Sequence, residues 1–151
     1  MKAAANISLY EMAKRFRSES LSLHDFQSWL GASTSSEVSA ISPGVLLRLK
    51  SGGVERVMLA VAKILPACAI CEGISEERVF QDLAEHRQCS DRLGSVLALE
   101  KMVRIPRPEW VTDEITFQYG IDGYYQCLSC DTRWMLIEPE RGRYGEWLRI
   151  S

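Results

Sequence analysis

Residues 123–150 read GYYQCLSCDTRWMLIEPERGRYGEWLRI, and this stretch decides how the C-terminal part of the chain folds. It contains Cys127 and Cys130, whose spacing lets both sulfurs face one metal ion while backbone N–H groups face the sulfurs. The alternation that begins at Thr132 is typical of a strand that leaves a turn, and a second apolar run returns at 146–150 after the glycine-containing turn at 141–145. We therefore predict a β-hairpin with a C-x-x-C knuckle, which is half of a zinc-ribbon pattern.

The chain before this hairpin has mainly helical patterns. N-terminal capping signals and apolar periodicity predict helices at residues 8–18, 22–30, 43–50, 54–65, 75–88 and 91–102. Residues 105–108 read IPRP and cannot form a helix interior, and Ile115, Phe117 and Tyr119 then alternate as in a strand. We expect an α+β fold, with a bundle of about six helices over residues 1–104. A small antiparallel, zinc-ribbon-like subdomain follows at 105–151, and whether the two pack as one unit stays open.

Three residue pairs share the spacing of two intervening residues that a metal knuckle needs. They are Cys68 and Cys71, His86 and Cys89, and Cys127 and Cys130. Structural zinc takes four sulfur or nitrogen ligands in a tetrahedron, so two pairs complete a site. We predict zinc at Cys68, Cys71, Cys127 and Cys130, with His86 and Cys89 as the alternative partners of the hairpin pair.

An alternative interpretation leaves these cysteines without metal. The 55 residues between 72 and 126 exceed the usual separation of the two halves of a zinc ribbon. Cysteine is also among the residue types most often buried in protein cores. The alanine and isoleucine around Cys68 and Cys71 favour core packing for that pair taken alone.

Composition places the chain among ordinary globular proteins. Of 151 residues, 46% are hydrophobic and 25% are charged, as in typical soluble domains. No apolar run approaches the ~18 residues of a membrane span, and the N-terminus has no signal-peptide pattern. We expect a cytoplasmic protein, in which cysteines are reduced thiols or metal ligands rather than disulfides.

The charge distribution favours a basic partner over nucleic acid. The net charge is −2, and residues 72–91 contain six acidic residues against two arginines. An acidic surface attracts basic proteins and repels a phosphate backbone. The alternative is that these are solvated helix faces without any partner.

No catalytic constellation is evident, so we expect a protein that is not an enzyme. His24 and His86 are the two histidines, and His24 lies beside Asp25 at a predicted helix start, where capping explains it. No nucleophile elbow or phosphate-binding glycine loop occurs. A redox role for either C-x-x-C pair would need a preceding core strand and a following helix, which neither pair has.

Residues 21–30 read LSLHDFQSWL, and residues 45–49 are rich in leucine. On these two motifs, residues 7–65 resemble small helical bacterial immunity proteins, which neutralise colicin-like and contact-dependent toxins. The resemblance implies a non-catalytic toxin inhibitor that docks on a basic toxin or nuclease through an acidic surface. The partner-binding residues would then be Glu72, Glu76, Glu77, Asp82 and Glu85.

The hairpin leaves a second class of function open, a zinc-ribbon nucleic-acid-associated or regulatory protein. Tyr124, Tyr125 or Trp134 would then stack on bases. Phosphates would be contacted by Arg133, Arg141, Arg143 and Arg149. Four acidic residues balance these arginines, which disfavours a nucleic-acid partner.

Overall fold

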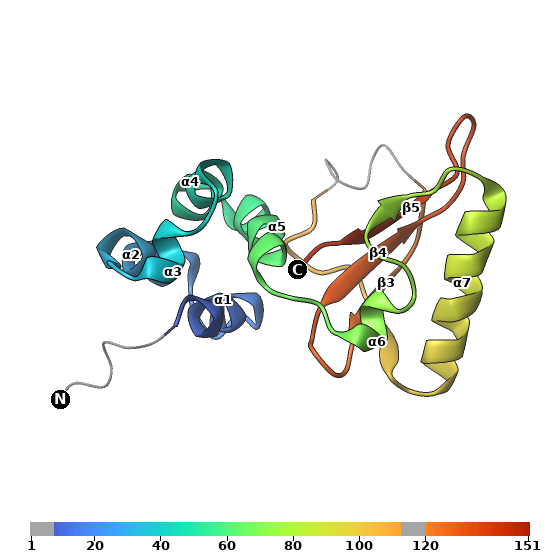
Figure 1. The fold of residues 1–151 in the computed structure, drawn as a ribbon, viewed down its shortest axis with the longest axis horizontal. Helices are drawn as coiled ribbons and strands as arrows, with labels where there is room; N and C mark the ends of the chain where they lie inside the picture. Colours follow the sequence, from blue (N-terminus) through green and yellow to red (C-terminus); the bar gives the residue numbers. More distant parts are fainter. Residues whose placement is uncertain (1–7, 113–119) are drawn as a thin grey trace. The chain divides into compact units, whose positions relative to one another are not determined.

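A computed structural model describes residues 8–112 and 120–151 of the protein (Figure 1). Over these residues it has seven helices and a five-stranded antiparallel sheet in the order β1-β5-β4-β3-β2. The predicted α+β class with a C-x-x-C knuckle is therefore confirmed. The chain divides into two compact units, residues up to Pro66 together with Ser151, and Ala67–Ile150.

The first unit is a bundle of short helices. They are α1 (Leu9–Arg17), α2 (Leu23–Ala32), α3 (Ser36–Ser39), α4 (Pro43–Ser51) and α5 (Val54–Ile64). The hydroxyl of Ser8 caps α1 by accepting the N–H of Glu11, as the sequence predicted. Phe16 of α1 stacks on Phe26 of α2 with ring centroids 5.2 Å apart. Four of these helices were predicted, and α3 is a single turn between two of the predicted helices.

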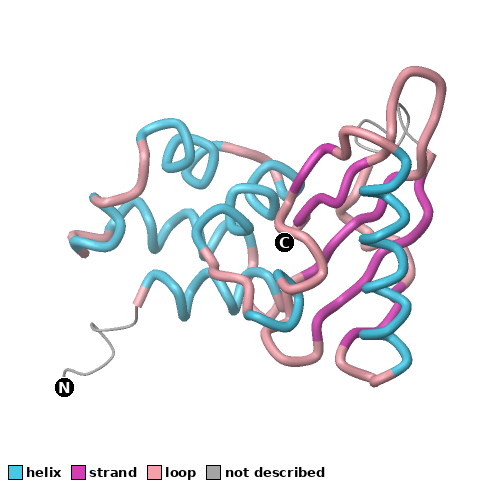
Figure 2. Tube along the Cα trace, turned by 45° about the vertical axis from the view of Figure 1, so that its right-hand side comes forward, coloured by secondary structure: helices cyan, strands magenta, loops and turns pink. Residues whose placement is uncertain are grey.

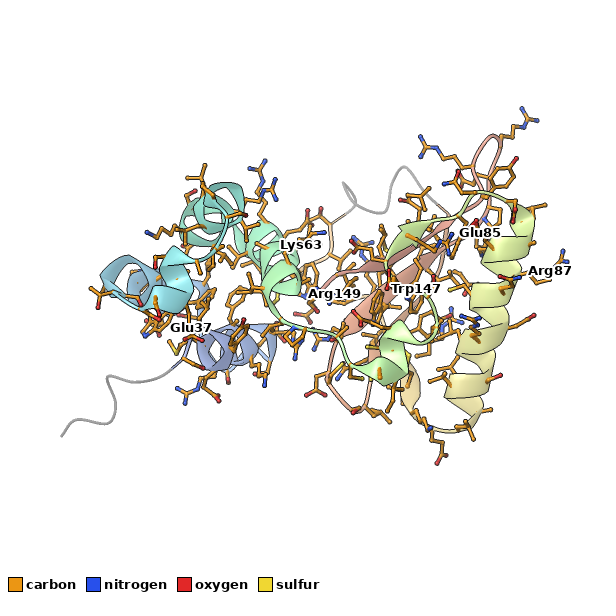
Figure 3. All side chains as sticks on the ribbon, viewed as in Figure 1. Glu37, Lys63, Glu85, Arg87, Trp147 and Arg149 are labelled. Carbon is orange, nitrogen blue, oxygen red and sulfur yellow. The ribbon has the colours of Figure 1, made fainter. Side chains whose placement is uncertain are left out.

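The second unit packs one long helix on a sheet. Its elements are α6 (Ala69–Glu72), β1 (Arg78–Val79), α7 (Leu83–Ala98), β2 (Met102–Ile105), β3 (Ile121–Cys127), β4 (Arg133–Ile137) and β5 (Glu146–Arg149). Helix α7 lies along one face of the sheet in both views (Figures 1 and 2). Cys89 and Leu93 of α7 share a buried cluster with Trp134 and Trp147 of the sheet, and Trp147 is labelled in Figure 3. The two indoles stack with centroids 5.0 Å apart and planes inclined by 7°.

The predicted hairpin strands are present as β4 and β5. Strand β3 pairs with β4 across the knuckle, with Gln126 opposite Arg133, and β4 pairs with β5, with Ile137 opposite Glu146. The tip closes through paired backbone hydrogen bonds between Glu140 and Arg143. The strand predicted from Ile115, Phe117 and Tyr119 lies outside the described residues.

Residues 75–102 differ from the two helices predicted there. Asp82 caps α7 by accepting the Glu85 N–H at 2.8 Å, so the helix begins at Leu83 rather than near residue 75. Residues 88–91 are polar but compatible with a helix, and α7 runs through them without a break. Before it, β1 pairs with β5, and after it β2 pairs with β3.

The expected boundary at 104–105 falls inside the second unit, because the first unit ends at Pro66. Buried side chains between residues 71 and 102 share one core with strands β3, β4 and β5. Cys71, Ile74, Phe80 and Leu93 belong to the same buried cluster as Trp134 and Trp147. The sequence pattern located the change from helices to strands near residues 104–105. The two units instead divide at Pro66, because the residues after it belong to the core of the second unit.

Candidate metal centre

The two predicted cysteine pairs come together in the second unit. The Sγ atoms of Cys68, Cys71, Cys127 and Cys130 all lie within 4.8 Å of one another. Cys68 is 3.5 Å from Cys127 and 3.8 Å from Cys71, and Cys71 is 3.6 Å from Cys130, measured between sulfurs. A tetrahedron of sulfurs about 2.3 Å from a central ion has edges of roughly 3.8 Å. The four thiols are therefore spaced as ligands of a single metal ion, and the cluster can hold one.

The first knuckle forms where α5 has ended and the short helix α6 begins. Cys68 is the N-cap residue of α6, which places the backbone N–H groups of Cys71 and Ile70 toward its sulfur. Burial alone would raise the pKa of the Cys68 thiol. Hydrogen bonds from these N–H groups, together with the sulfurs of Cys127 and Cys130, lower that pKa to about 6.

The second knuckle joins β3 to β4 and repeats this arrangement. The N–H of Asp131 donates to the Cys127 carbonyl at 2.9 Å, and Asp131 adopts a φ of 62°, which closes a tight turn. The N–H groups of Cys130 and Ser129 face the Cys127 sulfur. In both knuckles the first cysteine therefore receives N–H groups from the residues two and three positions later. These donors stabilise negative charge on sulfur, as metal-bound thiolates require.

At the two inner thiols burial outweighs the hydrogen bonds, so the net shift of each pKa is upward. Cys71 and Cys127 are both 0% exposed, and burial raises the pKa of each thiol. Contact with the Cys130 sulfur adds to the increase for Cys71. A metal ion that binds here must displace the protons of these two buried thiols.

The alternative ligands His86 and Cys89 are not part of this group of four. Cys89 is buried in the core between α7 and the sheet, and burial raises its pKa to about 12 despite the nearby Arg92 and Arg78. The imidazole of His86 packs edge-on against Phe80 with centroids 5.6 Å apart. Both residues contribute to packing, and neither completes the hairpin pair.

Three of the five predicted partner-binding carboxylates have partners within the second unit. Glu77 accepts the backbone N–H of Arg149 at 2.9 Å, and Asp82 caps α7. Glu85, at the start of α7 (Figure 3), forms an ion pair with Arg78 at 2.6 Å. Glu72 and Glu76 are exposed, and they are the members of the predicted set best placed for an external partner.

The aromatic residues predicted to stack on bases are largely buried. Trp134 is 1% exposed and stacks on Trp147, and Tyr125 is 3% exposed. The Tyr125 hydroxyl donates to the Asp122 carboxylate at 2.9 Å, and Arg133 donates to the Gln126 side chain at 3.2 Å. These contacts engage Trp134 and Tyr125 in the interior of the second unit and Arg133 at the knuckle, whereas Arg141 and Arg143 are exposed.

One further residue contacts the cysteine cluster and was not predicted from the sequence. Thr132 is 1% exposed, and its Oγ1 lies 3.1 Å from the Cys130 sulfur. Its carbonyl accepts the N–H of Cys127 at 2.9 Å, which fixes Thr132 against the knuckle. The sequence does show a hydroxyl residue, Thr132, two positions after the second cysteine of the knuckle. We assigned Thr132 to the predicted strand and gave it no role at the metal site.

Comparison of the chain with protein-family models, with curated proteins and with solved structures found no match. No helix within residues 8–112 and 120–151 is long and apolar enough to cross a membrane.

The donor atoms of the cysteine cluster determine what it can do chemically. Four thiolates fill a tetrahedral shell and leave no open position for water or a substrate, which is the arrangement of structural rather than catalytic metal sites.

Proposed function

We propose that the second unit binds one Zn²⁺ through Cys68, Cys71, Cys127 and Cys130, and that the ion has a structural role. The spacing of the four sulfurs is the observation that supports this proposal. Tetrahedral sulfur sites suit zinc or iron, and zinc accepts this geometry without any ligand-field preference. The two knuckles supply N–H donors to the first cysteine of each pair, which favours thiolate ligands.

The ion would join two segments that are distant in sequence. Cys68 and Cys127 are 59 positions apart, and the two pairs flank β1, α7 and β2. A metal bond between them holds α6 at the end of β3, where the chain turns into β4. Because this closed site has no free coordination position, its expected contribution is to stability rather than to catalysis.

Elemental analysis of protein purified without chelator tests this proposal. We expect one zinc per chain and four thiols that become reactive only after denaturation or chelation. The variant Cys89→Ser is the matched control, because it removes a buried thiol outside the cluster and should retain one zinc. Absence of metal, or iron with visible charge-transfer absorption, would contradict a zinc centre.

We propose further that the protein is a non-catalytic binding protein, an inhibitor of the immunity type with a basic partner. Residues 67–150 contain fifteen acidic residues against ten basic ones, whereas the first 66 residues contain five against eight. Four thiolates around a divalent ion would add negative charge to the same unit. Glu72 and Glu76 are exposed and close in sequence to Cys71, so they are the residues to change first.

Charge reversal tests the docking surface. The double variant Glu72→Lys and Glu76→Lys should slow association with a partner captured at low salt, because complementary charge acts mainly on the association rate. The matched control reverses Glu11 and Glu19 in the first unit, where the same charge change should have little effect. Association rates measured over a range of ionic strength would contradict the proposal if both double variants matched the wild type.

A further inference from the structure

A buried hydroxyl contacts one of the four sulfurs. Thr132 Oγ1 lies 3.1 Å from Cys130 Sγ, and the threonine is 1% exposed. Buried polar groups in proteins are nearly always hydrogen-bonded, so this contact satisfies a hydroxyl that would otherwise be costly to bury. Its position is fixed by the backbone, since the Cys127 N–H donates to the Thr132 carbonyl at 2.9 Å.

The direction of this hydrogen bond depends on the state of the sulfur. A neutral Cys130 thiol donates its proton to the Thr132 oxygen. A metal-bound thiolate has no proton and can only accept. The threonine hydroxyl can rotate and is both donor and acceptor, so the contact persists with Thr132 as donor. A hydrogen bond from a hydroxyl to a charged sulfur is stronger than a hydrogen bond from a hydroxyl to a neutral acceptor.

The sulfur that Thr132 contacts is on the more accessible side of the cluster. Cys71 and Cys127 are completely buried, whereas Cys68 and Cys130 are half-buried. Water, acids and competing chelators therefore reach Cys68 and Cys130 first. A donor on Cys130 would neutralise part of its charge and restrict its rotamer at the point where the site is most open.

We infer that Thr132 is a positioning residue of the metal centre, which donates its hydroxyl to the Cys130 thiolate and slows loss of the ion. The inference rests on the proposed zinc centre. Hydrogen-bond partners of metal ligands orient those ligands, and their removal typically weakens metal binding by about 10- to 100-fold. Thr132 does not touch the ion, and it acts through Cys130.

The test compares zinc release from the full-length chain with and without this hydroxyl. The probe is the coloured chelator 4-(2-pyridylazo)resorcinol, added to zinc-loaded protein. Thr132→Val keeps the shape of the side chain and should release zinc about tenfold faster or more. Thr132→Ser keeps the hydroxyl and should behave like the wild type. Ser129→Ala is the control, because it removes an exposed hydroxyl from the same knuckle.

A second readout separates a hydrogen bond from a packing effect. In cobalt-substituted protein, loss of the donor should shift the sulfur-to-metal charge-transfer band of Thr132→Val to longer wavelength, while Thr132→Ser should retain the wild-type band. If Thr132→Val does not fold, Thr132→Ala provides the same comparison. Equal release rates for wild type and Thr132→Val, or equal acceleration in Thr132→Ser, would overturn the inference and leave the zinc centre standing. A wild-type protein without stoichiometric metal would overturn both.

Discussion

Replacing Cys127 with serine should destabilise the second unit mainly by opening a long loop. A metal bond between Cys68 and Cys127 closes a chain segment of 59 residues. The chain-entropy relation for a cross-link of this length gives about 4 kcal/mol at 25 °C. Because the stability of a whole domain is typically about 5–15 kcal/mol, loss of the cross-link should remove a large fraction of it.

Thermal unfolding followed by tryptophan fluorescence measures this loss. Trp134 and Trp147 are stacked and at most 1% exposed, so their emission reports the core of the second unit. For a unit of this size, about 4 kcal/mol corresponds to a fall in Tm of about 15 °C or more. Chelation of the wild-type protein should produce a fall of similar size, because it removes the same cross-link.

Cys89→Ser provides the matched control for this experiment. Cys89 is 2% exposed and lies in the same core, so a hydroxyl buried there should cost about 1–3 kcal/mol without affecting metal content. The reasoning would be refuted if Cys127→Ser retained one zinc, or if chelation left the Tm of the wild type unchanged. A Cys127→Ser variant no less stable than Cys89→Ser would also refute the loop argument.

Two further predictions concern protons and backbone. At pH 7, zinc loading should release one whole proton each from Cys71 and Cys127, because burial raises the pKa of both thiols. It should release only a fraction of a proton from Cys68, whose pKa is about 6. Calorimetry in buffers of different ionisation enthalpy counts the released protons, and the affinity for zinc should fall as the pH is lowered. Gly145→Ala should lower the free energy of unfolding, measured by urea denaturation, more than Gly142→Ala does. Both glycines have a positive φ, so both substitutions introduce backbone strain. Only at Gly145 would the added Cβ also collide with the Ile137 carbonyl oxygen and the His86 ring. Equal costs for the two alanine variants would contradict the predicted collision at Gly145.

The local elements could be predicted wherever one short signal determined the structure. The starts of α1 and α2 were predicted correctly because the hydroxyl caps, Ser8 and Ser22, act on N–H groups within three residues. The strands on either side of the 141–145 turn followed from alternation and glycine. Residues 75–88 gave a wrong start because Ser75 and Asp82 are both plausible caps, and pairing of Arg78 and Val79 with β5 decided between them.

The two C-x-x-C pairs predicted the metal centre, but the long separation between the pairs counted against it. A separation of 55 residues between the pairs is long for two knuckles that form a compact ribbon by themselves. In this fold the intervening chain forms β1, α7 and β2, and β2 pairs with β3. The N–H of Leu128, which lies between the two cysteines of the second knuckle, therefore donates to the Lys101 carbonyl. The long insertion is therefore part of the folded unit, and its ends meet because the helix and strand return the chain to the knuckle.

This topology explains why a metal ion would be useful to such a unit. Helix α6 is four residues long, and helices of this length have little stability of their own. Cys71 and Ile74 bury side chains in the core, but Cys68, near the start of the unit, is only half-buried. A bond from Cys68 through an ion to Cys127 would fix the start of the second unit to the end of β3. Loss of the ion should therefore loosen residues 67–74 first, and hydrogen exchange at these amides should rise after chelation before exchange in α7 does.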